Sequence, residues 1–278
     1  MKETRAEYLP IQKLRPFEGH PFKVTDNEEM DQLTWSILTQ GLLTPLVVRP
    51  LDNGEYEVIS GHRRLHACKK AGIETVPALI YAIDRDAAAI ALVDSNLQRE
   101  HILPSEKAFA YKLKLEAMNH QGRTSGQVGQ KWTRDEIAEG ESGRQVQRYI
   151  RLTNLIPGVL QKVDEGRIAL TPAVELSYLT DAEQEDLLET MESEDCTPSL
   201  SQAIQMKTLS QSGQLDMDKI FSIMTQPKAN QQEKISFKVS ELRDFFPRHY
   251  TAAQMMQEIK MALKERQQRL ARQRDHSR

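Results

Sequence analysis

The sequence predicts an α+β protein with a small mixed α/β domain at the N-terminus, an all-α middle domain that carries a helix-turn-helix, and a short αβ or helical segment at the C-terminus. Three observations favour this class. Helix and strand signals alternate at first, strand signals stop after Arg99, and the polar stretch 226–233 is typical of a linker. Because 278 residues exceed what one core usually needs, we expect domains at 1–100, 101–210 and 211–278.

The first domain is predicted from local start and stop signals. The helix over 26–40 has an Asp26–Glu29 capping-box pair at its start and a glycine at its end. Asn53-Gly54 is typical of a tight primed hairpin turn, because both residues tolerate the positive φ angles that it needs. The expected elements are the helix over 26–40, strands over 45–49, 55–60 and 75–82, and helices over 61–71 and 85–96.

The middle of the chain is predicted to be helical. A helix over 105–119 precedes a glycine-containing loop at 119–130. Each further helix start is predicted from a capping box or from a threonine cap followed by proline. These starts lie at Thr180–Glu183, Thr171-Pro172 and Thr197-Pro198.

The last part is predicted as a strand over 234–239 followed by a helix from about Thr251 and a basic tail. An apolar stripe on this helix is suited to dimerisation, and a helix packed on its own strand is the alternative. The stripe consists of Met255, Met256, Ile259 and Leu263.

Composition indicates a helix-rich chain with 39% hydrophobic and 28% charged residues. The longest apolar run, 87–93, is too short to cross a membrane, and the N-terminus lacks a hydrophobic signal core. The two cysteines, Cys68 and Cys196, form no CxxC pair, so we expect a reducing cytoplasm and no membrane partner. Residues 168–206 hold nine acids and no Lys or Arg, which leaves 37 basic against 31 acidic residues elsewhere. This segregation permits a DNA-binding region, and a solvated acidic face is the ordinary alternative.

Residues 56–72 read YEVISGHRRLHACKKAG, so a short apolar strand leads directly into a glycine and a basic helix. Gly61 lets a ligand approach the backbone, and the N-terminus of the following helix attracts anions. Arg63 and Arg64 add forked, charge-assisted donors that suit phosphate oxygens. These residues predict a phosphate cradle, with the alternative that both arginines pair with acids such as Glu57 or face water.

Residues 132–155, WTRDEIAEGESGRQVQRYIRLTNL, predict a helix-turn-helix. Capping boxes at Thr133–Glu136 and Ser142–Gln145 begin two short helices on either side of a glycine-containing turn. On the second helix, apolar residues face inward and a row of Gln and Arg faces outward, as suits base edges and phosphates. An ordinary amphipathic helix with a basic face is the alternative. The DNA-binding candidates are Arg144, Gln145, Gln147, Arg148 and Arg151.

Both candidate sites, in this order, resemble the ParB/RepB partition-protein family over residues 8–205. ISGHRRLHACKKAGIETVPALI resembles the family's Gly-Glu-Arg-Arg box with the Ala-Gly and Val-Pro that follow it. SNLQREHILPSEKAFAY is similar to its Glu-Asn-x-Gln-Arg box and to the Pro-x-Glu-x-Ala helix after it. The third matching part is the helix-turn-helix with Ile150-Arg151-Leu152 at its end.

The resemblance implies a protein that binds a palindromic, centromere-like site in double-stranded DNA and closes into a homodimeric clamp with CTP. It also implies a ParA-type ATPase as partner and a cytoplasmic location on the nucleoid or a plasmid. Asn96 would help to hold Mg²⁺, with Asp94 as a further ligand. The residues implied around the nucleotide are Thr44, Pro45, Gly61, His62, Arg63, Arg64, Asn96 and Arg99.

Three positions depart from the family pattern. His62 and Ser95 each stand where a box has glutamate, and Thr44 stands where glutamine usually precedes the proline. Loss of two carboxylates leaves fewer hard oxygen ligands for Mg²⁺, so we expect CTP hydrolysis to be weak at most. The first helix of the helix-turn-helix is also slightly short between Ala138 and Gly140.

Other classes stay open from the sequence. A transcriptional regulator or silencer would share this architecture without a role in segregation. A sulfiredoxin-like enzyme would need a cysteine at His62, and a nuclease would need clustered acids, which the sequence does not offer. A metal site made of His62, His66 and Cys68 would place a cation in strongly basic surroundings.

Overall fold

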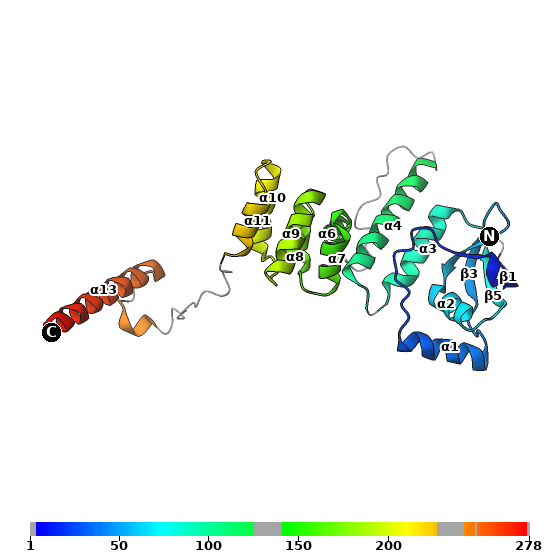
Figure 1. Cartoon of the computed structure of the whole chain (residues 1–278), viewed down its shortest axis with the longest axis horizontal. Coiled ribbons are helices and arrows are strands. Elements are labelled where there is room, and N and C mark those ends of the chain that lie inside the picture. The colour runs from blue at the N-terminus through cyan, green and yellow to red at the C-terminus, as the bar shows by residue number, and fades with distance from the viewer. Residues whose placement is uncertain (1–3, 100, 125–140, 227–241, 248, 277–278) are drawn as a thin grey trace. The chain divides into compact units, whose positions relative to one another are not determined.

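The computed structural model divides by its contacts into two units, Met1–Gln226 and Pro227–Arg278 (Figure 1). No helix in the described part of the chain is long and apolar enough to cross a bilayer. The residues that the structure describes are 4–99, 101–124, 141–226, 242–247 and 249–276. The predictions that lie outside them are most of the 226–233 linker, the 234–239 strand and the first helix of the helix-turn-helix.

The N-terminal part of the first unit is a mixed sheet of the strands β1 (Thr4–Pro10), β2 (Leu14–Pro16), β3 (Leu46–Pro50), β4 (Tyr56–Ser60) and β5 (Thr75–Tyr81). The strand order is β1-β5-β3-β4-β2. The β1–β5 and β3–β4 pairs are antiparallel, whereas β3–β5 and β2–β4 are parallel. The mixed sheet and its three later strands are confirmed. The edge strands β1 and β2 were not predicted, because their charged residues and proline leave no clear apolar alternation.

Helices α1 (Glu28–Gln40) and α2 (His62–Lys70) pack on one face of this sheet, and α3 (Arg85–Leu97) packs on the other. The helix α4 (Pro104–Thr124) packs on α3. The adjacent β4 residues Val58 and Ile59 belong to two different cores, because successive side chains of a strand point to opposite faces. Val58 shares a core with Met30 and Ile37 of α1, and Ile59 shares one with Leu92 of α3. The strand that leads into α2 is therefore buried on both sides.

Two local predictions in this part were wrong in detail. α1 is capped by Asn27, whose side chain accepts from Met30 N at 3.0 Å, while the Asp26 carboxylate pairs with basic side chains of α2. In the hairpin turn Gly54 has a φ of 78°, but Asn53 is not among the described residues with positive φ. The turn is therefore not of the primed type that needs two such residues.

The rest of the first unit is helical, with α6 (Gly143–Arg151), α7 (Pro157–Asp164), α8 (Leu170–Leu176), α9 (Asp181–Ser193), α10 (Leu200–Gln211) and α11 (Met217–Met224). Leu176 of α8, Met206 of α10 and Ile220 of α11 are fully buried in one shared core. Since α11 belongs to this core, the helical part extends past the predicted boundary at 210 and ends at Gln226.

Among the predicted helix starts, the capping box is confirmed at Thr180–Glu183, and the starts at Thr171-Pro172 and Thr197-Pro198 are wrong. α8 begins after Ala169, because proline fits anywhere in a first turn whose N–H groups lack partners. α10 begins after Ser199, which forms a complete capping box with Gln202. α4 continues to Thr124, so the first residues of the loop predicted at 119–130 are helical.

The second unit contains the short 3-10 helix η3 (Arg243–Phe245) and the long helix α13 (Ala252–His276). The predicted C-terminal helix is thus confirmed. Within its apolar stripe Met255 is buried, whereas Met256 and Leu263 are exposed. Dimerisation through this stripe stays a prediction.

Candidate functional site

The junction between β4 and α2 is shaped by Gly61. Its φ is 103°, a left-handed conformation that side chains other than glycine rarely adopt. A Cβ on this residue would also lie 2.6 Å from Cδ2 of Leu46, which is fully buried in β3. The chain therefore turns sharply at the end of β4, and α2 starts without a side-chain cap over its first N–H groups.

A cavity of about 220 Å³ opens over this helix N-terminus, and we call it the cradle cavity. The end of β4 and the start of α2 form one side, and the C-terminal end of α3 forms the other. Tertiary packing thus brings together six of the eight residues predicted around a nucleotide. The lining consists of Ser60, Gly61, His62, Arg63, Arg64, Ser95, Asn96 and Arg99.

Arg64 links the cavity to the loop before β3. Its Nη1 donates to the backbone oxygens of Thr44 at 2.6 Å and Pro45 at 2.9 Å. Thr44 and Pro45 are not among the lining residues, so their described connection to the cavity runs through this guanidinium. Burial lowers the pKa of Arg64. An anion beside it would compensate that loss of hydration.

Arg99 brings positive charge from the opposite side of the cavity. Its guanidinium lies 5.5 Å from the ring centroid of Phe22. Burial lowers the pKa of Arg99, the Glu106 carboxylate partly offsets this effect, and the nearby charge of Arg63 lowers the pKa further. Two guanidinium groups that repel each other in a half-buried cavity favour an anion between them.

Arg63 is half-buried, whereas Arg99 is exposed. The Arg63 side chain is 41% exposed and forms an ion pair with Glu29 of α1 at 3.0 Å. The sequence left open that Arg63 and Arg64 pair with acids such as Glu57. Arg63 does pair with an acid, but its partner is Glu29. Glu57 is buried and pairs with Arg49 at 2.6 Å. Exposed pairs of this kind are weak, so a phosphate can replace Glu29 at little cost.

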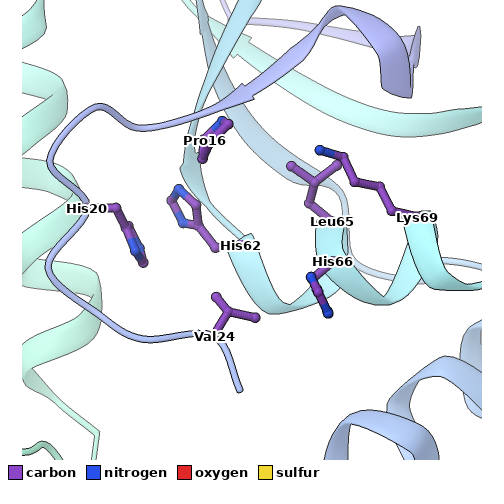
Figure 2. A pocket seen from close by; sticks show the side chains of 7 residues that line it. All are labelled: Pro16, His20, Val24, His62, Leu65, His66 and Lys69. Atoms are coloured by element: carbon purple, nitrogen blue, oxygen red, sulfur yellow. The ribbon is translucent and has the colours of Figure 1, made fainter. Parts of the chain in front are cut away.

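His62 forms the wall between the cradle cavity and a second, mainly apolar cavity of about 240 Å³ (Figure 2). Its ring stacks on that of His20, and its Nε2 accepts from the backbone N–H of Phe17 at 3.4 Å. Burial lowers the pKa of His62 to about 3, so the ring is neutral near pH 7. The sequence had no signal for His20 as its partner, because the two residues are distant in the chain.

The donor set of the cavity does not fit the Mg²⁺ ion that the resemblance implies. Asp94 is turned away, with its Oδ1 2.6 Å from Nζ of Lys114 on α4, and it does not line the cavity. Asn96 is buried in the lining, where its amide donates to the backbone oxygen of Leu92 at 2.8 Å. No carboxylate is among the described residues of this lining, whereas Mg²⁺ is usually held by carboxylates.

The metal alternative at His62, His66 and Cys68 is not assembled either. His66 bonds to Asp26 at 3.0 Å, and Cys68 is fully buried in the core of the sheet. Within the ranges that the structure describes, no group of three metal-binding side chains is formed. Burial also raises the pKa of the Cys68 thiol, which disfavours the thiolate that a sulfiredoxin-like reaction needs.

The second helix of the predicted helix-turn-helix is α6, and its start is as predicted. Oγ of Ser142 accepts from Gln145 N at 3.3 Å. Gln145 Oε1, however, accepts from Arg148 at 3.1 Å, so the predicted capping box is not completed. The inward position of Val146 is confirmed, since it is fully buried.

The outward row of α6 is less free than predicted. Arg144 is exposed, and Gln147 is half-buried. Arg148 donates to Oγ1 of Thr171 at 2.6 Å, which leaves it at the surface beside α8. Arg151 does not face out, because its guanidinium bonds to Ser177 and lies 3.8 Å from the ring centroid of Tyr178. A role of these residues in DNA binding stays a prediction.

Comparison with known proteins finds similarity to ParB proteins in the N-terminal domain and over most of the chain. Residues 1–97 match the family model described as the ParB N-terminal domain. The "Probable chromosome-partitioning protein ParB" of Vibrio cholerae is 31% identical over 238 residues, which cover 84% of this chain and 77% of that protein. The "Nucleoid occlusion protein" of Geobacillus sp. (strain WCH70) is 36% identical over 119 residues, or 42% of each chain, so less than half of that relative is spanned.

A solved relative is the C-terminally truncated chromosome-partitioning protein ParB from Caulobacter crescentus. Its complex with the centromeric parS site is 24% identical, has a TM-score of 0.43, and covers 74% of this chain and 99% of that one. Its complex with CTP-gamma-S is 26% identical and has a TM-score of 0.32. The match covers 68% of this chain and 99% of that one.

Proposed function

The chain belongs to the ParB family, and we propose that it is a DNA-binding partition protein that holds CTP in the cradle cavity and closes on DNA as a homodimer. The observation that carries the nucleotide part is the convergence of Arg63, Arg64 and Arg99 on the N-terminus of α2. Unpaired N–H groups, the helix dipole and forked guanidinium donors all favour a chain of phosphates at this point.

The DNA part of the proposal rests on α6 and on the family. Arg144 and Arg148 lie at the surface of this helix, where they are suited to phosphate or base contacts. The proposed site is a palindrome in double-stranded DNA, read by two copies of the chain. The proposed partner is a ParA-type ATPase, and the chain works in the cytoplasm on the nucleoid or on a plasmid.

CTP binding is tested by isothermal titration calorimetry on the full chain. Arg63→Ala is expected to weaken binding by about tenfold to a hundredfold, because one charge-assisted phosphate contact is worth roughly 1.5–3 kcal/mol. Arg167→Ala is the matched control, since Arg167 is 40% exposed and also pairs with an acid, Asp195, at 3.0 Å. Absence of CTP binding by the unmodified chain would contradict the nucleotide part of the proposal.

DNA recognition is tested by chromatin immunoprecipitation to recover the bound fragment, followed by fluorescence anisotropy. Arg148→Ala is expected to weaken binding to that fragment by about tenfold and to leave binding to unrelated DNA less affected. An unchanged affinity would show that α6 is not the reading helix.

A role in nucleoid occlusion or gene regulation is the second candidate. The similarity to the Geobacillus protein called "Nucleoid occlusion protein" favours this second role. Stimulation of a ParA-type ATPase by the purified chain would support partition. Binding sites dispersed around the chromosome, without such stimulation, would support the second role.

A further inference from the structure

The cradle cavity combines several cations with a lack of metal ligands. We propose that it binds the polyphosphate of its nucleotide without a divalent metal ion and leaves the nucleotide uncleaved. This inference rests on the proposed function, because it concerns how the same site holds its ligand.

Charge compensation is the first argument. A metal ion on a nucleoside triphosphate neutralises phosphate charge so that the phosphates can enter a partly dry site. Here the protein supplies that charge from Arg63, Arg64 and Arg99, together with the N-terminus of α2. Arg64 is half-buried and Arg99 is exposed, and partial loss of hydration lowers the pKa of both guanidinium groups, so phosphate oxygens are their natural partners.

The ligand inventory is the second argument. The uncharged oxygens that the lining offers are hydroxyl and amide oxygens, and the Ser95 hydroxyl already donates to the backbone oxygen of Leu92 at 2.9 Å. Three carboxylates lie near the arginines, those of Glu29, Asp94 and Glu106, and none of them lines the cavity. Asp94 pairs with Lys114, and Glu106 accepts from the backbone N–H groups of Lys23 and Leu103. A hard cation that usually takes one or two carboxylates therefore finds none among the lining residues that the structure describes.

The absence of a general base is the third argument. Hydrolysis of the phosphoanhydride bond between the β- and γ-phosphates needs a group that positions or deprotonates water within hydrogen-bond reach. His62 lines the cavity, but its Nε2 accepts from the backbone N–H of Phe17. His62 therefore serves as a wall of the cavity, and its Nε2 lone pair is not free for water or metal.

The test is calorimetry of the full chain with CTP in buffer that contains either Mg²⁺ or EDTA. We expect the dissociation constants to agree within about threefold, a difference below 1 kcal/mol. A larger loss of affinity in EDTA overturns the inference and leaves the proposed nucleotide site standing. If CTP binds in neither buffer, the proposed function fails at this site and the inference fails with it.

A carboxylate placed in the lining gives a matched pair of variants. Ser95→Asp is expected to bind CTP at least about tenfold more tightly in Mg²⁺ than in EDTA, because its charge repels phosphate unless a cation bridges them. Ser95→Asn loses the same hydroxyl hydrogen bond but gains no charge. The ratio of its CTP dissociation constants in EDTA and in Mg²⁺ should therefore stay near that of the unmodified chain. Equal ratios for both variants would overturn the inference.

Cleavage is followed separately by chromatography of CTP incubated with the chain and its immunoprecipitated DNA fragment. We expect no CDP above the level of a protein-free blank. CDP release that depends on the chain and is lost in Arg64→Ala would overturn the second half of the inference.

Discussion

The imidazole rings of His62 and His20 stack with their centroids 3.7 Å apart and their planes inclined by 37° (Figure 2). His20 comes from the segment between β2 and α1, and His62 is the first residue of α2. His62 lines the cradle cavity, and both rings line the mainly apolar cavity beside it. Two charges at this separation would repel each other, so the stack is an arrangement of the uncharged histidines.

Acid is expected to destabilise the fold through this pair. Burial is the main cause that lowers the pKa of His20 to about 4 and that of His62 to about 3, from an ordinary 6.5. A depressed folded pKa gives stability that is fully present above pH 6.5 and is lost as the pH falls towards the folded value. Below pH 6.5, each histidine should reduce the free energy of unfolding by at most about 1.4 kcal/mol per pH unit.

Urea unfolding at several pH values between the folded and unfolded pKa values checks this expectation. The slope of stability against pH should be smaller in His62→Gln than in the unmodified chain, because one proton fewer is taken up on unfolding. The slope is the readout, so a general loss of stability in the variant does not obscure it. Identical slopes would show that the stack does not control the titration.

Gly61→Ala is expected to lower the free energy of unfolding by about 2–4 kcal/mol. The new Cβ would meet both an unfavourable φ of 103° and the Leu46 side chain at 2.6 Å. Gly72→Ala is the control, because its φ is 70° but no atom lies within 4 Å of the added Cβ. Gly72→Ala should lower the free energy of unfolding only by the backbone strain of a positive φ, about 1 kcal/mol. Equal losses in urea unfolding would mean that Leu46 moves aside freely.

The two arginines of α2 are expected to separate stability from binding. Arg64→Ala leaves the backbone oxygens of Thr44 and Pro45 without this donor, so it should lower the free energy of unfolding by about 1–2 kcal/mol. It should also abolish CTP binding. Arg63→Ala removes only an exposed ion pair and should change stability by less than about 1 kcal/mol. Thermal denaturation measures the change in stability of each variant, and calorimetry measures its affinity for CTP. A variant Arg64→Ala with normal CTP affinity would contradict the cradle.

Arg144 and Arg151 of α6 are expected to act on different properties. Arg144→Ala should lower the salt dependence of DNA binding by about one unit of slope, because an exposed phosphate contact is lost. Arg151→Ala should instead destabilise the helical part by about 1–2 kcal/mol, because its bonds to Ser177 hold α6 against the end of α8. Anisotropy titrations over a range of salt and urea unfolding separate the two. The assignment fails if Arg151→Ala is as stable as the unmodified chain.

Local signals in the sequence were sufficient for most helices and for the centre of the cradle. The step from β4 to α2 was predicted because Gly61, Arg63 and Arg64 are neighbours, and their chemistry depends little on the rest of the chain. The capping box at Thr180–Glu183 was predicted for the same reason. The Thr-Pro predictions failed for two reasons. Ser199 caps α10 in place of Thr197, and α8 begins after Ala169 without any side-chain cap.

Tertiary structure decided which distant residues complete the site. Packing of α3 on β4 brings Asn96 and Arg99 into the cradle cavity, and packing of α4 on α3 diverts Asp94 to Lys114. Contacts of this kind connect segments that share no local pattern, because they depend on which faces of the helices become buried. The order of residues thus specified a helix start whose chemistry suits phosphate. The fold decided that arginines and a neutral histidine, without a carboxylate among the described lining residues, surround it.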